Sequence, residues 1–299
     1  MGMAFEGNIL TSSCHPSLGL CKNPWKNELS VTQSYSLNPV RISIITPSLN
    51  QGSFVQDCIV SVLEQTGAEV EHIVADAGST DETIEILQRY PHLLWTSEPD
   101  AGMSDGINKG FRRATGDWLM WLNCDDFLLP GALAKVADFV KQNPDLDVVH
   151  GDCVFVRADK SVIRRKYDHP LGELVLLFAG CYIPSTATFF KRRIIDQSQF
   201  LDTSYKVCMD WEYYLRLIRA GFKFGYLPAA LAGFRWHSSN TSLVLIGRGY
   251  EEGVRLQREH IAIRRISPLL ARKWMLPPLR RLFQLQRILK RLATHGRLF

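Results

Sequence analysis

Short segments with the composition of buried strands alternate with helical segments between residues 41 and 125. The strand pattern covers four runs: "RISIITPS" (41–48), "EHIVAD" (71–76), "HLLWTSE" (92–98) and "DWLMWLN" (117–123). Apolar residues at helical spacing fill the connections, and Ser53 with Gln56 and Ser79 with Glu82 have the spacing of capping boxes. Strands that alternate with helices form parallel sheets, so the sequence predicts a doubly wound α/β sheet with helices on both faces.

The alternation becomes looser after residue 126. The following segments predict a helix at 130–142, strands near 147–156, 186–190 and 224–234, and a helix near 210–219. This pattern indicates that the sheet continues as a mixed sheet within the same domain. Residues 1–39 are rich in Ser, Asn, Pro and Gly and lack periodicity. We therefore predict an N-terminal extension (1–39), a main domain (40–245) and a basic helical tail (246–299).

Basic residues are concentrated in the tail. Residues 255–299 hold twelve Lys and Arg and one acidic residue, so the preceding 254 residues carry −6 within the chain total of +5. An acidic body with a basic tail argues against a nucleic-acid-binding protein. Apolar and basic residues interleave in the tail: Leu282, Phe283, Leu285, Ile288, Leu289, Leu292, Arg280, Arg281, Arg287, Lys290 and Arg291. This pattern predicts peripheral contact with a membrane surface, and a helix packed on the main domain or on a partner is the alternative.

The sequence favours a cytoplasmic protein. Residues 1–20 lack the basic start and long apolar block of a signal peptide, and the most apolar stretch, 174–183, is far too short to cross a bilayer. The seven cysteines are odd in number and form no CxxC pair, which is typical of reduced thiols. We expect a cytoplasmic location, with the tail at the inner face of the cytoplasmic membrane.

Polar residues follow three of the predicted strands directly. They occupy 46–50 ("TPSLN"), 76–81 ("DAGSTD") and 123–126 ("NCDD"). Each group alone is also typical of a turn. Because ligands of open α/β sheets bind beyond the carboxyl ends of the strands, three such groups predict one binding crevice.

The adjacent carboxylates of Asp125 and Asp126 indicate what binds in this crevice. Two like charges side by side disfavour ionisation unless a cation offsets them. The loops G-x-G-x-x-G and G-x-x-x-x-G-K-[ST], which bind phosphates through glycine-rich backbone, are absent from the sequence. We therefore predict a divalent cation, Mg2+ or Mn2+, shared with a diphosphate ligand, and a plain strand-to-helix turn is the alternative.

Four segments in order resemble family 2 glycosyltransferases of the GT-A fold: "ISIITPSLN", "IVADAGSTDET", "EPDAGMSDGINKGFRRATGDWLMWLNCDD" and "MDWEYYLRLIRAGFKFGYLP". Together they cover roughly residues 41–240. The resemblance implies a metal-dependent enzyme that moves a sugar, with inversion, from a UDP, GDP or dTDP donor to a hydroxyl of a saccharide or lipid-linked acceptor. It also implies a role in cell-surface polysaccharide or glycolipid assembly.

The resemblance assigns roles to individual residues. Nucleotide-sugar contacts fall on Pro47, Ser48, Asn50, Asp76, Asp100, Gly102, Asp105, Asn108, Asn123 and Asp125, with the nucleobase at Asp76. Metal contacts fall on Asp125, Asp126 and His237, although a lone His after an aromatic run is also typical of a packed loop residue. Asp210 matches the position of the general base, which accepts the acceptor's proton, and a helix N-cap is its alternative role.

The chain departs from the family pattern at three positions. Asn123 stands where many relatives carry the first Asp of the metal motif, so the metal depends on Asp125 and Asp126. Ala77 replaces a second Asp after Asp76, and Met209 replaces a Glu before the base.

Two other functions share these features. A sugar-1-phosphate nucleotidyltransferase has a similar nucleotide-binding sheet, but its first strand is normally followed by a glycine-rich basic loop, and "TPSLNQGS" contains no basic residue. The other alternative is a non-catalytic nucleotide-sugar-binding protein. The carboxylates of Asp76, Asp125, Asp126 and Asp210 argue against a decayed site.

Overall fold

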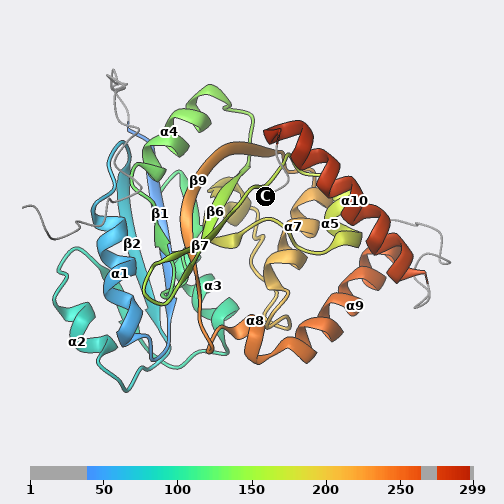
Figure 1. Cartoon of the computed structure of the whole chain (residues 1–299). Helices are drawn as coiled ribbons and strands as arrows, with labels where there is room; N and C mark the ends of the chain where they lie inside the picture. The colour runs from blue at the N-terminus through green and yellow to red at the C-terminus, as the bar shows by residue number, and fades with distance from the viewer. Residues whose placement is uncertain (1–38, 264–274, 297–299) are drawn as a thin grey trace, which may run out of the picture. The chain divides into compact units, whose positions relative to one another are not determined.

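The computed structural model describes residues 39–263 and 275–296. Within these residues the central feature is a sheet of nine strands in the order β3-β2-β1-β4-β8-β6-β9-β5, with β7 paired to β6 (Figure 1). The strands are β1 (Arg41–Ser48), β2 (Glu69–Asp76), β3 (Leu94–Ser97), β4 (Trp118–Trp121), β5 (Phe127–Leu128), β6 (Val148–Arg157), β7 (Val162–Lys166), β8 (Thr188–Lys191) and β9 (Phe224–Trp236).

The first four strands are parallel, as the alternation of the sequence predicts. β1 pairs with β2 and with β4, and β2 pairs with β3. The helices that connect them are α1 (Gly52–Leu63), α2 (Thr83–Gln88) and α3 (Met103–Arg113). The chain moves outward from β1 to β3 and then returns to add β4 on the other side of β1. This change of direction creates a crevice at the ends of β1 and β4.

Alternate residues of β1 enter two different cores. Ile42 and Ile44 pack with residues of α1 and of α4 (Ala132–Gln142) on one face of the sheet. Ile45 packs on the other face with Phe111 of α3 and with residues of α5 (Glu173–Ala179) and α7 (Met209–Arg219). Because side chains of a strand alternate between its two sides, a fully buried strand needs helices on both faces. The predicted doubly wound architecture is confirmed.

The second half of the sheet is mixed, which confirms the looser pattern after residue 126. β8 is antiparallel to β4 and to β6, whereas β6 and β9 run parallel over most of their length. β5 has only two residues and lies antiparallel to β9. The sequence pattern does not predict β5, β7 or α5. The short α6 (Arg193–Asp196) and 3-10 helix η1 (Ser185–Ala187) complete this half.

The C-terminal segment is helical, as predicted, and forms α8 (Thr241–Val244), α9 (Ile246–Ile263) and α10 (Leu276–His295). α10 lies against α5 (Figure 1), where the ring of Phe283 stacks on Phe178 with 5.1 Å between centroids. The alternative of a packed tail therefore holds for one face of α10. None of the helices in residues 39–263 and 275–296 is long and apolar enough to cross a bilayer. The boundaries at 39 and 245 stay a prediction.

The two predicted capping boxes are wrong. α1 begins at Gly52, so Ser53 lies inside its first turn, and the N–H of Gly52 donates to Asp81 Oδ2 instead (2.9 Å). α2 begins at Thr83, and the hydroxyl of Ser79 donates to Asp76. Asp81 also accepts the N–H of Thr83 (3.1 Å), so its side chain takes the place of both predicted caps.

The packing of α3 on β1 depends on a glycine. A Cβ at Gly110 would lie 2.4 Å from Cγ2 of Ile45, inside a buried contact. We expect Gly110→Ala to lower the free energy of unfolding by roughly 1–3 kcal/mol. Gly247→Ala in α9 is the matched control, because nothing lies within 4 Å of its Cβ position. Urea denaturation of both variants checks this, and equal midpoints would contradict the tight contact.

Candidate active site

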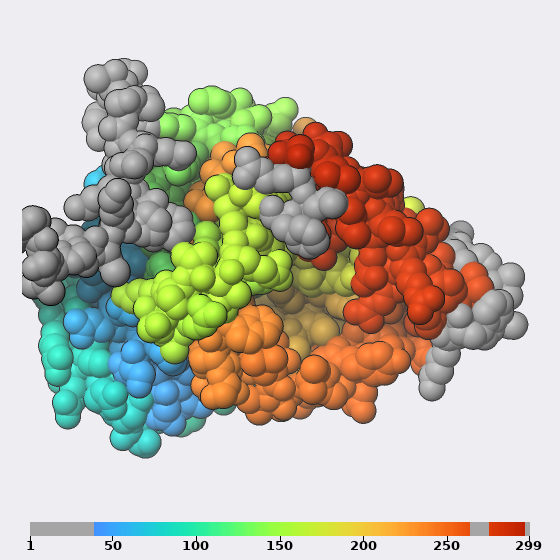
Figure 2. All heavy atoms as spheres, viewed as in Figure 1, coloured from blue at the N-terminus to red at the C-terminus, as the bar shows by residue number. Residues whose placement is uncertain are grey.

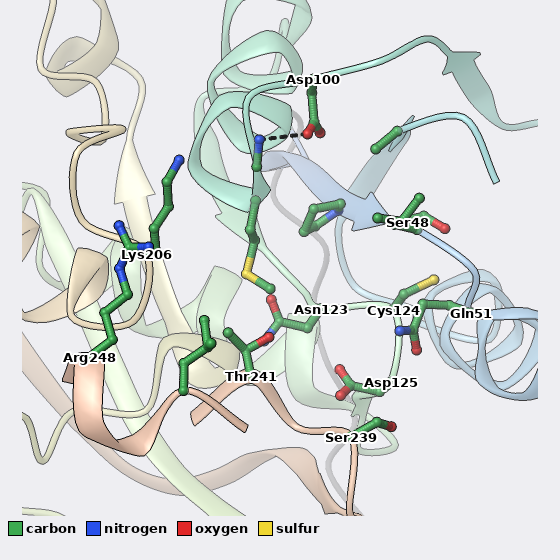
Figure 3. A pocket seen from close by; sticks show the side chains of 16 residues that line it. Ser48, Gln51, Asp100, Asn123, Cys124, Asp125, Lys206, Ser239, Thr241 and Arg248 are labelled. Carbon is green, nitrogen blue, oxygen red and sulfur yellow. Dashed lines mark hydrogen bonds between the residues drawn. The ribbon is translucent and has the colours of Figure 1, made fainter. Parts of the chain in front are cut away.

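A pocket of about 410 Å³ opens at the ends of β1, β2 and β4 (Figure 3). Pro47 and Ser48 belong to the end of β1, Ala77 follows β2, and Asn123 and Asp125 follow β4. All three predicted polar groups therefore contribute to one pocket. Its position at the β1–β4 crevice is where open α/β sheets bind ligands.

Asp76 lies beside this pocket at the end of β2, with its carboxylate held by the turn that follows. The N–H groups of Gly78 and Ser79 donate to Oδ2 (3.0 and 2.8 Å), and the hydroxyl of Ser97 donates to the same atom (2.6 Å). Burial by itself raises the pKa of Asp76, but the hydrogen bonds from Ser79 and Ser97 outweigh it and hold the pKa below its usual value. Asp76 is therefore a fixed, ionised acceptor.

Asn50 joins the loops that follow β1 and β2. Its φ of 51° lies in the left-handed region, which Asn tolerates better than most residues. Its Oδ1 accepts a hydrogen bond from the N–H of Thr80 (2.9 Å), and its own N–H donates to Ser79 Oγ (2.8 Å). Asn50 thus shapes the wall of the pocket, while Ser48 and Gln51 line it.

The carboxylates of Asp125 and Asp126 point in different directions. Asp125 lines the pocket, and its Oδ2 lies 2.9 Å from Nε2 of His237. Asp126 is 1% exposed, and its Oδ1 accepts the N–H of Arg235 (2.8 Å). Its Oδ2 has no hydrogen-bond partner within residues 39–263 and 275–296. Burial and the adjacent charge of Asp125 raise the pKa of Asp126 well above its usual range.

Arg235, at the end of β9, holds this acidic turn in place. Its guanidinium is 2% exposed and donates to the backbone oxygens of Asp125 (2.8 Å) and Ala158 (2.7 Å). It also forms an ion pair with Asp57 of α1 (2.9 Å) and lies over the ring of Phe54. Burial alone raises the pKa of Asp57, but hydrogen bonds from Lys160 and Arg235 outweigh it and lower the pKa. Arg235 therefore acts inside the fold and not on a ligand.

Asp125 and His237 are the two side chains near the pocket that could hold a divalent cation. The carboxylate of Asp125 lines the pocket, and the imidazole of His237 lies 2.9 Å behind it, a pair that suits a cation whose other ligands are phosphate oxygens and water. The described part of the chain contains no group of three or more His, Cys, Asp or Glu that could hold a metal ion. Asp126, with its carboxylate turned into the core, does not complete the set. The residues present therefore fit a cation that arrives with a diphosphate.

The predicted sugar-binding segment is divided between the pocket and the core. Asp100 and Gly102 line the pocket, and Oδ1 of Asp100 accepts the N–H of Gly102 (2.7 Å). Asp105, in the first turn of α3, accepts a hydrogen bond from the backbone of residue 101 (3.1 Å). Asn108 is buried, and its amide both donates to and accepts from the backbone of Leu201 (2.9 Å each). Its bonds position the loop before α7.

Two cationic side chains that no sequence motif marks also line the pocket. Lys206 and Arg248 lie on one side of it, opposite Ser48 and Cys124 (Figure 3). The ammonium group of Lys206 donates to the backbone oxygen of residue 101 (2.6 Å), and Arg248 pairs with Glu252 of α9 (2.9 Å). They come from segments without a recognisable motif, so only the fold could reveal them. They supply positive charge opposite Asp125.

Asp210 lies in the first turn of α7, next to the start of α3. Ser104 of α3 donates to the neighbouring Met209 Sδ (2.9 Å) and to the backbone oxygen of Tyr205 (3.3 Å). Asp210 as a whole residue is partly exposed, and its Oδ1 accepts the N–H of Trp211 (2.7 Å). Burial raises the pKa of Asp210, although the hydrogen bond from Trp211 opposes the rise. A carboxylate of raised pKa is suited to accept a proton.

Cys181 and Lys166 surround this carboxylate from the side of α5 and β7. The thiol of Cys181 donates to Asp210 Oδ2 (3.6 Å), and the charge of Lys166 lowers the pKa of Asp210. Lys166 itself donates to the backbone oxygen of Tyr182. The sequence shows neither contact, because both residues are far from Asp210 along the chain.

Similar proteins of known fold have this architecture. S. aureus TarS 1-349 in complex with UDP-GlcNAc matches with a TM-score of 0.60 at 16% identity, over 85% of this chain and 73% of that one. The mannosyltransferase PcManGT from Pyrobaculum calidifontis, in complex with GDP-Man and Mn2+, matches with a TM-score of 0.57 at 17% identity, over 89% of this chain and 80% of that one. The fold is therefore of the GT-A type found in glycosyltransferases.

The sequence itself gives the family. Residues 43–233 match Glycosyl transferase family 2. A PGL/p-HBAD biosynthesis glycosyltransferase of Mycobacterium bovis is 32% identical over 180 residues, 58% of this chain and 68% of that protein. The chain belongs to glycosyl transferase family 2 and is a glycosyltransferase, which confirms the resemblance found in its motifs.

Arg235 provides a test of how the acidic turn is held. Arg235→Met keeps a long side chain but leaves Asp57 and two backbone oxygens without their buried partner. We expect the free energy of unfolding to fall by roughly 3 kcal/mol or more. Lys223→Gln breaks an exposed pair with Asp145 and should cost less than about 1 kcal/mol. Chemical denaturation compares them, and equal small losses would contradict the role of Arg235.

Proposed function

We propose that this glycosyltransferase moves a sugar, with inversion, from a nucleoside diphosphate to a hydroxyl group. The donor is a UDP-, GDP- or dTDP-sugar, and the acceptor is a saccharide or a lipid-linked saccharide of cell-surface polysaccharide or glycolipid assembly. One observation carries the proposal. Ser48, Asp100 and Asp125, which lie at or after the ends of β1, β3 and β4, line the pocket together with Lys206 and Arg248. This mixture of acidic, basic and hydroxyl groups suits a charged, polar ligand.

The position of each part of the donor follows from the chemistry of the walls. The nucleobase lies at the end of β2 near Asp76, beside Pro47, Ser48 and Asn50, where the bonds of the Asp76 carboxylate to Ser79 and Ser97 fix the wall of the pocket. The diphosphate lies between Asp125 and the cationic side chains, where its charge is offset. The sugar then lies toward Asp100 and Gly102.

Asp125 and His237 hold a divalent cation, Mg2+ or Mn2+, together with the diphosphate. A bound cation of this kind stabilises negative charge on a departing diphosphate as a Lewis acid. The solved neighbour with GDP-Man and Mn2+ supports this assignment by analogy of fold. Asp126 contributes by its buried bond to Arg235, which fixes the turn from which Asp125 reaches the pocket.

Asp210 is the general base of the proposal. It accepts the proton of the acceptor hydroxyl, whose oxygen attacks the anomeric carbon from the face opposite the diphosphate. The carboxylates of Asp125 and Asp126 do not serve, because one faces the donor and the other is buried. Asp210 is partly exposed and lies in a helix turn next to the donor segment of α3.

The two alternative functions have less support. Membership of family 2 argues against a sugar-1-phosphate nucleotidyltransferase. The match to a glycosyltransferase family and the similarity to a glycosyltransferase argue likewise against a protein that only binds nucleotide sugars. Incubation with a panel of nucleotide sugars separates the three functions through pyrophosphate exchange, release of nucleoside diphosphate, or binding alone.

The cation assignment predicts metal-dependent nucleotide binding. We expect UDP or GDP to bind the chelator-treated protein about tenfold or more weakly than in the presence of Mn2+, because Asp125 then faces the diphosphate unscreened. Asp125→Asn should remove the effect of Mn2+, and Asp145→Asn, at an exposed acid, should keep it. Titration calorimetry measures both. Identical affinity with and without Mn2+ in the unmodified protein would contradict the assignment.

The base assignment predicts a separation of binding from turnover. Asp210→Asn keeps the size of the side chain but removes its basicity, so kcat should fall on the order of 100- to 10,000-fold. The affinity for the nucleoside diphosphate should stay the same, because Asp210 is not part of the pocket lining. Release of nucleoside diphosphate and calorimetry measure the two quantities on one preparation.

A control and a pH profile complete this test. Glu212→Gln changes another acid of the same helix, which pairs with Arg216, and should leave kcat within about twofold. Because burial raises the pKa of Asp210, the acidic limb of kcat/KM lies at higher pH than an ordinary Asp would give. Removing the charge of Lys166 in Lys166→Gln raises this pKa further, so the limb moves to still higher pH. Near-normal turnover of Asp210→Asn would show that another group accepts the proton.

A further inference from the structure

One face of α10 is fixed to the body of the protein. Phe283 stacks on Phe178 of α5, and the guanidinium of Arg287 lies 5.1 Å from the ring centre of Tyr182. Near the end of the helix, Nε2 of His295 lies 2.8 Å from the hydroxyl of Tyr226 and 2.7 Å from the backbone oxygen of residue 168. These contacts determine which side of α10 faces away from the protein.

The other face of α10 carries a stripe of exposed leucines. Leu282, Leu285 and Leu289 are 57%, 60% and 64% exposed, and their spacing of three and four residues places them on one side of the helix. The apolar set that the sequence shows in the tail is therefore divided, since Phe283 and Ile288 are partly buried. A continuous row of large apolar side chains in water is unfavourable and is typical of a contact surface.

The charge of α10 is entirely positive. Its ionisable residues between Leu276 and His295 are Arg280, Arg281, Arg287, Lys290 and Arg291, with no Asp or Glu. Arg280 and Arg281 are exposed next to the first leucine of the stripe. Figure 2 shows α10 along the outside of the molecule. The segment 264–274 before the helix adds four Lys and Arg to the sequence and no acid.

We propose that the outward face of α10, formed by Leu282, Leu285, Leu289 and the flanking arginines, lies on an anionic lipid bilayer. Such a surface presents negative headgroups to Arg280 and Arg281 and an apolar interior to the leucines, so it satisfies both features. A symmetric dimer in which two copies of α10 pair fits less well, because two helices with only positive charges would repel one another.

The geometry is that of a helix in the plane of the interface. α10 has 20 residues but is too polar to span a bilayer, and its inner face is already occupied by the protein. The stripe alone would enter the boundary between headgroups and acyl chains. The cytoplasmic leaflet carries the anionic lipid that this charge requires. The inference depends only on α10 and holds whatever the sugar donor and acceptor are.

Flotation with vesicles of phosphatidylcholine alone, or mixed with phosphatidylglycerol, tests the leucine stripe. The full chain should float with the mixed vesicles, and Leu282→Gln/Leu285→Gln/Leu289→Gln should reduce the bound fraction roughly tenfold or more. The matched control is Leu63→Gln/Leu94→Gln/Val162→Thr, which changes three exposed apolar residues outside α10 and should bind normally. Unchanged circular dichroism and thermal melting establish that each variant is folded.

A second pair of variants tests the charge. Arg280→Gln/Arg281→Gln should weaken binding to the mixed vesicles, and added salt should weaken it in the unmodified protein. Arg89→Gln/Arg219→Gln removes the same charge from two exposed sites elsewhere and should bind normally. Equal flotation of the leucine variant and the unmodified protein would overturn the proposal. The proposal would also be overturned if the unmodified protein sedimented as a dimer and the leucine variant as a monomer. The stripe would then pair two copies of the chain.

Discussion

The buried guanidinium of Arg235 is the interaction on which the arrangement of the site depends. A charge that is 2% exposed must be paired and hydrogen-bonded, and Arg235 meets this requirement with Asp57 of α1 and two backbone oxygens. Its own N–H binds the carboxylate of Asp126. The strand β9, the helix α1 and the acidic turn after β4 are thereby fixed to one another. Asp125 can face the pocket because Asp126 is anchored behind it.

This anchoring separates two tasks that the sequence places on adjacent residues. Asp125 lines the pocket, where our proposal places a cation and a diphosphate, whereas Asp126 is buried and bonded within the fold. The proton acceptor of our proposal, Asp210, belongs to another element, the first turn of α7. Bonds from Ser104 and Asn108 of α3 hold the segment before α7 close to the donor loop. Donor binding and proton transfer are thus assigned to different walls of the site.

The sequence predicts the parts of the fold that follow from local periodicity. The predicted strand at 41–48 has the same bounds as β1. All of its residues after Arg41 are buried, because both faces of the sheet are covered. The capping boxes fail because Asp81, 29 residues away in the chain, accepts the N–H of Gly52, and because the hydroxyl of Ser79 donates to Asp76 at the end of β2. The role of Arg235 could not be predicted, since Asp125 and Asp57 lie 110 and 178 residues away in the chain. The same holds for Lys206 and Arg248, which no motif marks.

The most direct test of the donor site is a crystal structure of the protein with UDP or GDP and Mn2+. Our account predicts the base beside Asp76, the diphosphate between Asp125 and the side chains of Lys206 and Arg248, and the metal on Asp125 and His237. A nucleotide bound at another surface, with the pocket at the ends of β1 and β4 empty, would contradict it.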